Sequence, residues 1–179
     1  MKLAILDRDG VINYDSEHYI KSPAEWRPIP GAIGAIARLN QNGYRVTVAT
    51  NQSGIGRGLF DMATLNAIND KMMELVFRQG GRIDALFFCP HTEVEQCGCR
   101  KPRTGMLEEI AARFHTELKG VPSVGDSLKD LQAAESVGAQ PMLVLTGKGK
   151  ATKESGGMPK KTLVFDDLAE ASRYIVEQE

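Results

Sequence analysis

The sequence predicts an α/β protein in which helices cover both faces of one doubly wound, Rossmann-like parallel sheet, a three-layer α/β/α architecture. Two observations predict this class. Short apolar segments rich in β-branched residues alternate with amphipathic helical patterns along the whole chain, as is typical of parallel sheets with helical crossovers. The 179 residues are 42% hydrophobic and 25% charged, which is ordinary for one globular domain with its own core.

The predicted strands are short, mostly apolar and followed by glycine or polar residues. They are residues 2–7, 44–50, 83–89, 121–126, 140–147 and 161–167. The predicted helices carry apolar residues near helical spacing, and Asp61 and Ser127 stand where they can cap two of them. These helices are residues 31–43, 61–81, 104–115, 127–138 and 168–178. The polar, glycine-rich residues 146–161 are interpreted as a mobile surface loop.

The chain is expected to form one domain over residues 1–179, without a cap domain. Between the first strand and Thr50 there is room for one helix, and between Thr50 and Lys101 for one helix, one strand and one loop. Neither interval has room for an inserted domain. A site at the strand ends would stay open, and loops such as residues 14–28 and 90–100 would supply its specificity.

Charge and hydropathy exclude several classes of partner. The net charge is −1 and the pI is about 6.3. The chain therefore lacks the excess of basic residues that is typical of nucleic-acid-binding domains. No apolar run approaches the roughly 20 residues that cross a bilayer, and the N-terminal residues lack the longer apolar region of a signal peptide. The chain has no coiled-coil seam. We therefore expect a cytoplasmic protein, a monomer, without nucleic-acid or membrane partners.

Carboxylates follow two of the predicted strands. Asp7 and Asp9 end the first strand, and Asp126 and Asp130 lie in "GDSLKD" after the fourth. Taken alone, "DRDG" is more often a turn and Asp126 or Asp130 a helix cap. Taken together, Asp7, Asp9 and Asp126 would meet at one sheet edge, where a hard cation such as Mg²⁺ can hold their charges.

Neutral donors and cations follow two further segments. "TNQSG" (50–54) offers hydroxyl, amide and backbone N–H groups that can hold phosphate oxygens. In "RKP" (100–102), Lys101 can neutralise a phosphoryl group as a point charge, and the Arg100 guanidinium can bind a second oxyanion through two N–H groups. In isolation both segments read as ordinary polar surface loops. Their position beside the carboxylates favours a phosphate site.

The three cysteines lie within eleven positions. "CPHTEVEQCGC" contains Cys89, His91, Cys97 and Cys99. One imidazole and three thiolates make a closed tetrahedral set, the structural type of zinc site. A reducible thiol cluster with an incidental histidine is the alternative, and the ligand count favours zinc. Because no coordination position would stay open, the metal would have a structural role and would order the loop that leads into Arg100 and Lys101.

The ordered set "DRDGV", "TNQSG", "KP" and "GDSLKD" resembles the haloacid dehalogenase superfamily of phosphotransferases over essentially the whole chain. The resemblance implies that Asp7 is the nucleophile that becomes an aspartyl-phosphate and that Asp9 is the general acid and base. It implies that Thr50 and Asn51 hold the phosphoryl oxygens, which Lys101 neutralises. Asp126 would complete Mg²⁺ coordination with Asp7 and the Asp9 carbonyl, while Asp130 would position its neighbours.

"DRDGVIN", "TNQSGIGRG", the zinc loop and "CRKP" narrow the resemblance to a bacterial family of heptose-bisphosphate phosphatases from lipopolysaccharide biosynthesis. This implies a small-molecule sugar bisphosphate as substrate, which Arg100 would recognise. The implied pocket is lined by Asp15, Ser16, Glu17, His18, Thr50, Asn51, Gln52 and Ser53. With five residues between His91 and Cys97, the zinc loop is shorter than in some relatives, a departure that concerns the pocket rim.

Two other functions compete with this interpretation. Histidinol-phosphate phosphatase shares the superfamily and a similar zinc loop, and also cleaves a primary phosphate ester. A non-catalytic, zinc-stapled phosphate-binding module would be expected to lack one of the two carboxylates, Asp7 or Asp9. The single tryptophan, Trp26, is interpreted as loop packing and His115 as surface; His18 is equally consistent with a solvated loop residue and a substrate contact.

Overall fold

A computed structural model describes residues 1–178. Glu179, the last residue of the predicted domain, lies outside the described residues. The strands form one six-stranded sheet in the order β3-β2-β1-β4-β5-β6, and every neighbouring pair is parallel. The strands are β1 (Lys2–Leu6), β2 (Tyr44–Asn51), β3 (Ala85–Cys89), β4 (Pro122–Gly125), β5 (Gln140–Val144) and β6 (Leu163–Phe165).

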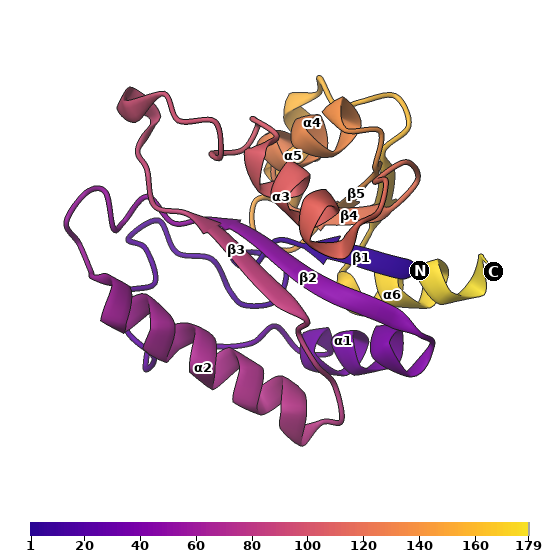
Figure 1. The fold of residues 1–179 in the computed structure, drawn as a ribbon, viewed down its shortest axis with the longest axis horizontal. Helices are drawn as coiled ribbons and strands as arrows, with labels where there is room; N and C mark the ends of the chain where they lie inside the picture. The colour runs from indigo at the N-terminus through magenta and orange to yellow at the C-terminus, as the bar shows by residue number, and fades with distance from the viewer. Residues whose placement is uncertain (179) are drawn as a thin grey trace.

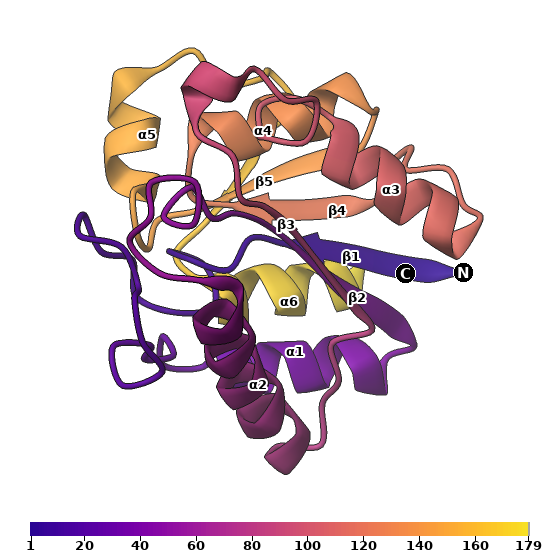
Figure 2. The same cartoon turned by 60° about the vertical axis from the view of Figure 1, so that its left-hand side comes forward.

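Helices cover both faces of the sheet (Figures 1 and 2). The long helices are α1 (Ala32–Gln41), α2 (Met62–Arg78), α3 (Gly105–Phe114), α4 (Leu128–Ser136) and α6 (Leu168–Glu177). Buried side chains of α1, α2 and α6 pack together on one face, and those of α3 and α4 pack on the other. The predicted three-layer α/β/α class is confirmed. No described helix has both the length and the apolar character that crossing a membrane requires.

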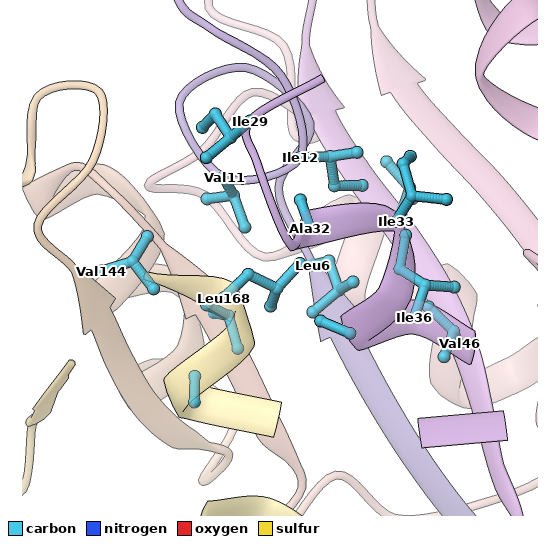
Figure 3. Close-up of a cluster of buried hydrophobic side chains, with 14 of the residues drawn as sticks. Leu6, Val11, Ile12, Ile29, Ala32, Ile33, Ile36, Val46, Val144 and Leu168 are labelled. Carbon is cyan, nitrogen blue, oxygen red and sulfur yellow. The ribbon is translucent and has the colours of Figure 1, made fainter. Parts of the chain in front are cut away.

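The larger core surrounds the end of β1. Leu6 is fully buried between Ile36 of α1 and Leu168 of α6 (Figure 3). The segment after the strand adds Val11 and Ile12 to the same core. Burying aliphatic side chains in this way supplies most of the favourable free energy of folding. The core therefore fixes the chain before and after Asp7, the residue that follows Leu6.

The predicted elements are present, most of them with ends shortened by a few residues, whereas β2 runs one residue further than predicted, to Asn51. Asp61 caps α2 by accepting a hydrogen bond from the Thr64 N–H at 2.8 Å, and Ser127 caps α4 in a capping box with Asp130. The interpretation of residues 146–161 as a loop is wrong in part, because α5 (Gly149–Ser155) lies there. This helix has one buried residue and hence no apolar stripe to detect.

The chain reverses its direction of travel across the sheet between β1 and β4. From β1 it proceeds to β2 and β3 on one side, while β4, β5 and β6 continue on the other. Such a switch point leaves a crevice at the carboxyl ends of the two central strands, where open α/β sheets bind ligands. Asp7 follows β1 and Asp126 follows β4 at this crevice.

Candidate active site

Asp7 lies at the switch point because its backbone extends the β1–β4 ladder. Its N–H donates to the Val124 carbonyl at 2.9 Å. Oxygens of Asp7, Asp126 and Asp130 lie within 4.8 Å of one another. Burial, reinforced by neighbouring carboxylates, raises the pKa of Asp7 well above its usual range and that of Asp126 to about 7. Three clustered carboxylates are costly without a cation to compensate them.

The backbone is shaped to bring Asp126 close to the first loop. Gly10 and Gly147 have φ angles of +83° and +54°, and a Cβ atom at these positions would lie 2.0 Å and 2.2 Å from Asp126 Oδ2. Only glycine fits so close to a carboxylate with a positive φ. The oxygen-rich, close-packed cluster fits a hard cation such as Mg²⁺, which Asp7 and Asp126 would hold.

Asp130 joins the acidic cluster but already has partners for both oxygens. Its Oδ1 lies 2.6 Å from Lys101 Nζ, and its Oδ2 accepts from the Ser127 N–H and hydroxyl at 3.0 Å and 2.7 Å. A carboxylate held in this way orients its neighbours. That Asp130 positions its neighbours during the reaction stays a prediction.

Lys101 is buried beneath the site, and its ammonium group contacts three oxygen atoms. Its Nζ donates to the Ala49 carbonyl at 2.7 Å and lies 3.2 Å from Asp7 Oδ1 and 2.6 Å from Asp130 Oδ1. Burial alone would lower the pKa of Lys101, but the charges of Asp130 and Asp7 raise it above its usual value. The side chain is therefore a fixed positive charge beside the Asp7 carboxylate.

Asp9 points away from the acidic cluster toward three donors. Arg8 donates through Nε at 3.0 Å, Asn13 through Nδ2 at 2.9 Å and Gln52 through Nε2 at 2.8 Å. Burial alone would raise the pKa of Asp9, but the Arg8 charge and these hydrogen bonds outweigh it and lower the pKa. The surroundings of the Asp9 side chain thus favour its ionised form, whereas burial raises the pKa of Asp7.

The predicted phosphate-holding segment divides into two groups of residues. Thr50 and Ser53 are buried, and both line the cavity. The amide of Asn51 is used to hold Lys101, because it accepts from the Lys101 N–H at 3.0 Å and donates to the Lys101 carbonyl at 3.1 Å. Gln52 Nε2 donates to Asp9 and to Thr50 Oγ1. The side chains of Asn51 and Gln52 therefore orient other site residues.

These side chains surround a cavity of about 570 Å³, within the usual size of a small-molecule site. Asp7, Asp9, Asp126, Asp130 and Lys101 line its inner part. The predicted pocket residues Asp15, Ser16, Glu17, Thr50, Asn51, Gln52, Ser53 and Arg100 also line it. His18 is exposed and is not among the lining residues; Tyr19 and Ile20 line it in that segment instead.

Cys89, His91, Cys97 and Cys99 converge in the loop that leads from β3 into Arg100. The Cys89 sulfur lies 3.5 Å from His91 Nδ1, 3.5 Å from the Cys97 sulfur and 3.1 Å from the Cys99 sulfur. Tetrahedral zinc with bonds of about 2.0–2.3 Å places its ligand atoms about 3.5 Å apart. The four side chains fit a structural zinc site. Burial opposes ionisation of Cys97, yet the Arg100 N–H helps to lower its pKa to about 6.

Four charged residues that line the cavity were not predicted as site residues. They are Arg57, Glu93, Lys129 and Lys148. Lys148 comes from the unpredicted α5 region, where its N–H donates to Asp126 Oδ2 at 2.8 Å and its Nζ lies 3.5 Å from Asp15. Isolated charged residues in polar loops carry no local signal. Only "GIGRG" around Arg57, adjacent to the predicted phosphate segment, could have drawn attention.

Trp26 and His115 lie where the sequence predicted. Trp26 is fully buried beneath the first loop, and Lys71 Nζ donates to its carbonyl at 2.8 Å. His115 is exposed at the C-terminal end of α3. Neither residue lines the cavity.

Two family models match the chain. A HAD-hydrolase-like model covers residues 98–171, and a polynucleotide kinase 3 phosphatase model covers residues 2–134. A D-glycero-beta-D-manno-heptose-1,7-bisphosphate 7-phosphatase from Bordetella bronchiseptica is 53% identical over 99% of both chains. One from Pseudomonas putida is 55% identical over 98% of this chain and 100% of its own. The chain belongs to this phosphatase family.

Solved structures agree with this family. The crystal structure of D,D-heptose 1,7-bisphosphate phosphatase from B. bronchiseptica, complexed with magnesium and phosphate, covers 100% of both chains with a TM-score of 0.99. The Burkholderia thailandensis structure of the same name is 52% identical over 98% of this chain and 99% of its own, with a TM-score of 0.79. The predicted superfamily and phosphatase class are confirmed.

Proposed function

We propose that this protein is a Mg²⁺-dependent phosphatase that removes the 7-phosphate of D-glycero-β-D-manno-heptose 1,7-bisphosphate in lipopolysaccharide heptose biosynthesis. The observation that carries the proposal is the position of Asp7. Its carboxylate stands at the switch point, 3.2 Å from Lys101 Nζ and within the acidic cluster with Asp126. The names of its full-length relatives support the choice of substrate.

Asp7 is the proposed nucleophile. A carboxylate oxygen attacks phosphorus, the bond between phosphorus and the C7 oxygen breaks, and the phosphoryl group is carried as an aspartyl-phosphate. Water then attacks phosphorus, inorganic phosphate leaves and the carboxylate returns. Covalent capture divides one difficult displacement into two easier ones. Lys101, fixed beside Asp7, offsets the charge repulsion between the carboxylate and the phosphoryl group.

Asp9 is the proposed acid and base. Protonated Asp9 gives its proton to the C7 oxygen as that oxygen leaves, and the resulting carboxylate takes a proton from the attacking water. In the free protein its three donors favour the ionised form. An incoming phosphoryl dianion raises the pKa of a neighbouring carboxyl, so substrate binding itself favours the protonated form that the first step needs.

Two metals complete the site. Bound Mg²⁺ supplies charge neutralisation for the phosphoryl oxygens, and Asp7, Asp126 and the Asp9 carbonyl are the proposed ligands. Cys89, His91, Cys97 and Cys99 are proposed to hold zinc away from the reaction, where it orders the loop that leads into Arg100 and Lys101. In this assignment Thr50 and the backbone of residues 51–53 hold the phosphoryl oxygens.

The cations at the outer end of the cavity favour a bisphosphate over histidinol phosphate. Arg57, Arg100 and Lys129 line this end. A second phosphate complements three cations, whereas the ammonium group of histidinol phosphate is repelled by them. The non-catalytic alternative is disfavoured because Asp7, Asp9 and Lys101 are all present around one cavity.

Phosphate release from a substrate panel with Mg²⁺ tests the proposal. The panel contains the heptose 1,7-bisphosphate, other sugar bisphosphates and histidinol phosphate. We expect the highest kcat/KM for the heptose bisphosphate. A higher kcat/KM for histidinol phosphate would overturn the substrate assignment, and no release from any member would favour the binding module.

Single-domain organisation over residues 1–179, a monomeric state and a cytoplasmic location are further parts of this proposal. The shared six-stranded sheet supports one domain. Sedimentation equilibrium tests the monomer, and fractionation of cells tests the location.

A further inference from the structure

Glu93 is one of the cavity carboxylates that take no part in the proposed chemistry. Glu93 lies in η1 (Glu93–Glu95), the short 3₁₀ turn within the zinc loop, and its side chain faces three cations. Its Oε1 accepts from Arg100 Nη2 at 2.8 Å and lies 3.4 Å from Lys129 Nζ, and its Oε2 lies 3.7 Å from Arg57 Nη2. All four side chains line the cavity that holds Asp7.

The three cations come from three separate segments of the chain. Arg57 follows β2, Arg100 follows the zinc loop, and Lys129 lies in the first turn of α4. With Glu93 among them the group keeps two net positive charges, since three cations meet one carboxylate. The arrangement is a ready anion site in which a carboxylate of the protein occupies the donors that an oxyanion would use.

We propose that Glu93 is an internal counter-ion that competes with the second phosphate of the substrate for Arg57, Arg100 and Lys129. This inference rests on the proposed function, because it takes the bisphosphate as substrate. Glu93 keeps the cations from repelling one another in the free enzyme and leaves them when the second phosphate binds. It returns when the monophosphate product leaves. Glu93 is therefore a specificity-determining residue that weakens binding of every ligand with this second phosphate.

The exposure of Glu93 allows such an exchange. The side chain is 60% exposed, whereas that of Arg100 is 12% exposed. A mobile carboxylate can turn into solvent at little cost, while Arg100 stays held by the loop through its N–H contact with the Cys97 sulfur at 3.4 Å. Exposed ion pairs contribute little net free energy, so a phosphate dianion can displace the carboxylate.

The test compares Glu93→Gln with Glu95→Gln as a matched control. Glu95 lies in the same turn, and its carboxylate accepts from the Thr92 N–H in a capping box that glutamine can also form. Both variants lose one negative charge, but only the first frees the three cations. Wild type and both variants are assayed with the heptose 1,7-bisphosphate and with phenyl phosphate, which has no second anion.

For Glu93→Gln we expect KM for the bisphosphate and the inhibition constant of the monophosphate product each to fall about three- to tenfold, the size expected for one exposed competing anion. KM for phenyl phosphate should stay unchanged, and Glu95→Gln should match wild type with both substrates. An unchanged or raised KM for the bisphosphate overturns the inference, as does an equal fall for both substrates. If wild type turns over phenyl phosphate but not the bisphosphate, the proposed function fails and this inference fails with it.

Discussion

At the scale of single residues, the two aspartates of the first loop differ because their neighbours differ. Asp7 faces Asp126 and Asp130, and burial raises its pKa. Asp9, two positions later, faces Arg8 and two amide donors, and its pKa is lowered. Adjacent carboxylates in unlike surroundings can take unlike roles, here the proposed nucleophile and the proposed acid and base.

Replacing Asp7 tests the nucleophile directly. Asp7→Asn should lower turnover of the bisphosphate by about 10⁴-fold or more, as expected when the group that forms the covalent intermediate is lost. Phosphate release measures the loss, and the circular dichroism spectrum should stay that of wild type because asparagine has nearly the same shape. Full turnover by a folded Asp7→Asn protein would contradict the assignment.

Asp126 makes magnesium binding depend on pH. Its pKa of about 7 means that below pH 7 a proton must leave before Mg²⁺ binds. Affinity for Mg²⁺, measured by calorimetric titration, should rise with pH below pH 7 by about tenfold per pH unit or more, because the raised pKa of Asp7 adds to the effect of Asp126. An affinity that is flat from pH 5 to 8 would contradict this expectation.

The same shift affects the metal-free protein in the opposite direction. The folded state holds a proton on Asp126 up to about pH 7, whereas the usual value is 3.8. The folded state therefore binds more protons than the unfolded state in this interval, and its stability should fall as pH rises from about 4 to 7. Thermal unfolding across this range, without and with Mg²⁺, measures the effect, and Mg²⁺ should reduce the loss.

Gly147 tests how closely the backbone must approach Asp126. Gly147→Ala places a methyl group 2.2 Å from Asp126 Oδ2 at a φ of +54°, so we expect Mg²⁺ affinity to fall at least about tenfold through displacement of the carboxylate. Gly157→Ala is the matched control, since Gly157 has a φ of +76° with nothing within 4 Å. That variant should lose some stability and keep its Mg²⁺ affinity. Equal affinities for both variants would argue against the close approach.

At the scale of elements, the zinc loop joins β3 to the cations of the cavity. Its ligands come from both ends of an eleven-residue stretch, with η1 and Glu93 between them. The Cys97 sulfur accepts a hydrogen bond from the Arg100 N–H. The Asn51 side chain is hydrogen-bonded to both the N–H and the carbonyl of Lys101. The position of Arg100 thus depends on the loop, while that of Lys101 has a second support from β2.

Removal of zinc should therefore affect the two cations unequally. After chelation, hydrogen exchange of residues 90–100 should become faster, while the amides of β1 should exchange as before because the core protects them. Mass spectrometry of peptides from both segments makes the measurement. KM for the bisphosphate should rise more than kcat falls. Unchanged exchange in residues 90–100 would contradict the proposed role of the metal.

At the scale of the whole molecule, the site and the core share β1. Leu6 packs against α1 and α6 (Figure 3), and the next residue in the sequence is Asp7. The sheet order places β1 and β4 at the centre, so both strand ends that carry the candidate site are supported by neighbours on each side. A site on rigid central strands keeps its geometry while the surrounding loops move.

Core truncation should accordingly cost global stability. Leu6→Ala removes a fully buried side chain and should lower the free energy of unfolding by about 2–5 kcal/mol. Phe77→Ala is the control, because Phe77 is 78% exposed on α2 and its loss should change stability by no more than about 0.5 kcal/mol. Denaturant unfolding measures both variants. Equal changes would mean that the core is not organised around β1.

The sequence alone determined the strands, the long helices and the candidate ligand sets, because those signals are local. Apolar alternation marks a strand within a few residues, and the four candidate zinc ligands lie in one short stretch of chain. It could not reveal α5, which has no apolar stripe and is held by Thr152 and Lys148 against Asp126.

Tertiary structure alone decided which charges meet. The register of β1 against β4 brings Asp130 beside Asp7 and Lys101, and Arg8 and Gln52 turn Asp9 aside. Glu93 meets Lys129 across 36 positions of sequence. Electrostatic interactions depend on distance in space and on burial, and neither quantity can be read from spacing along the chain.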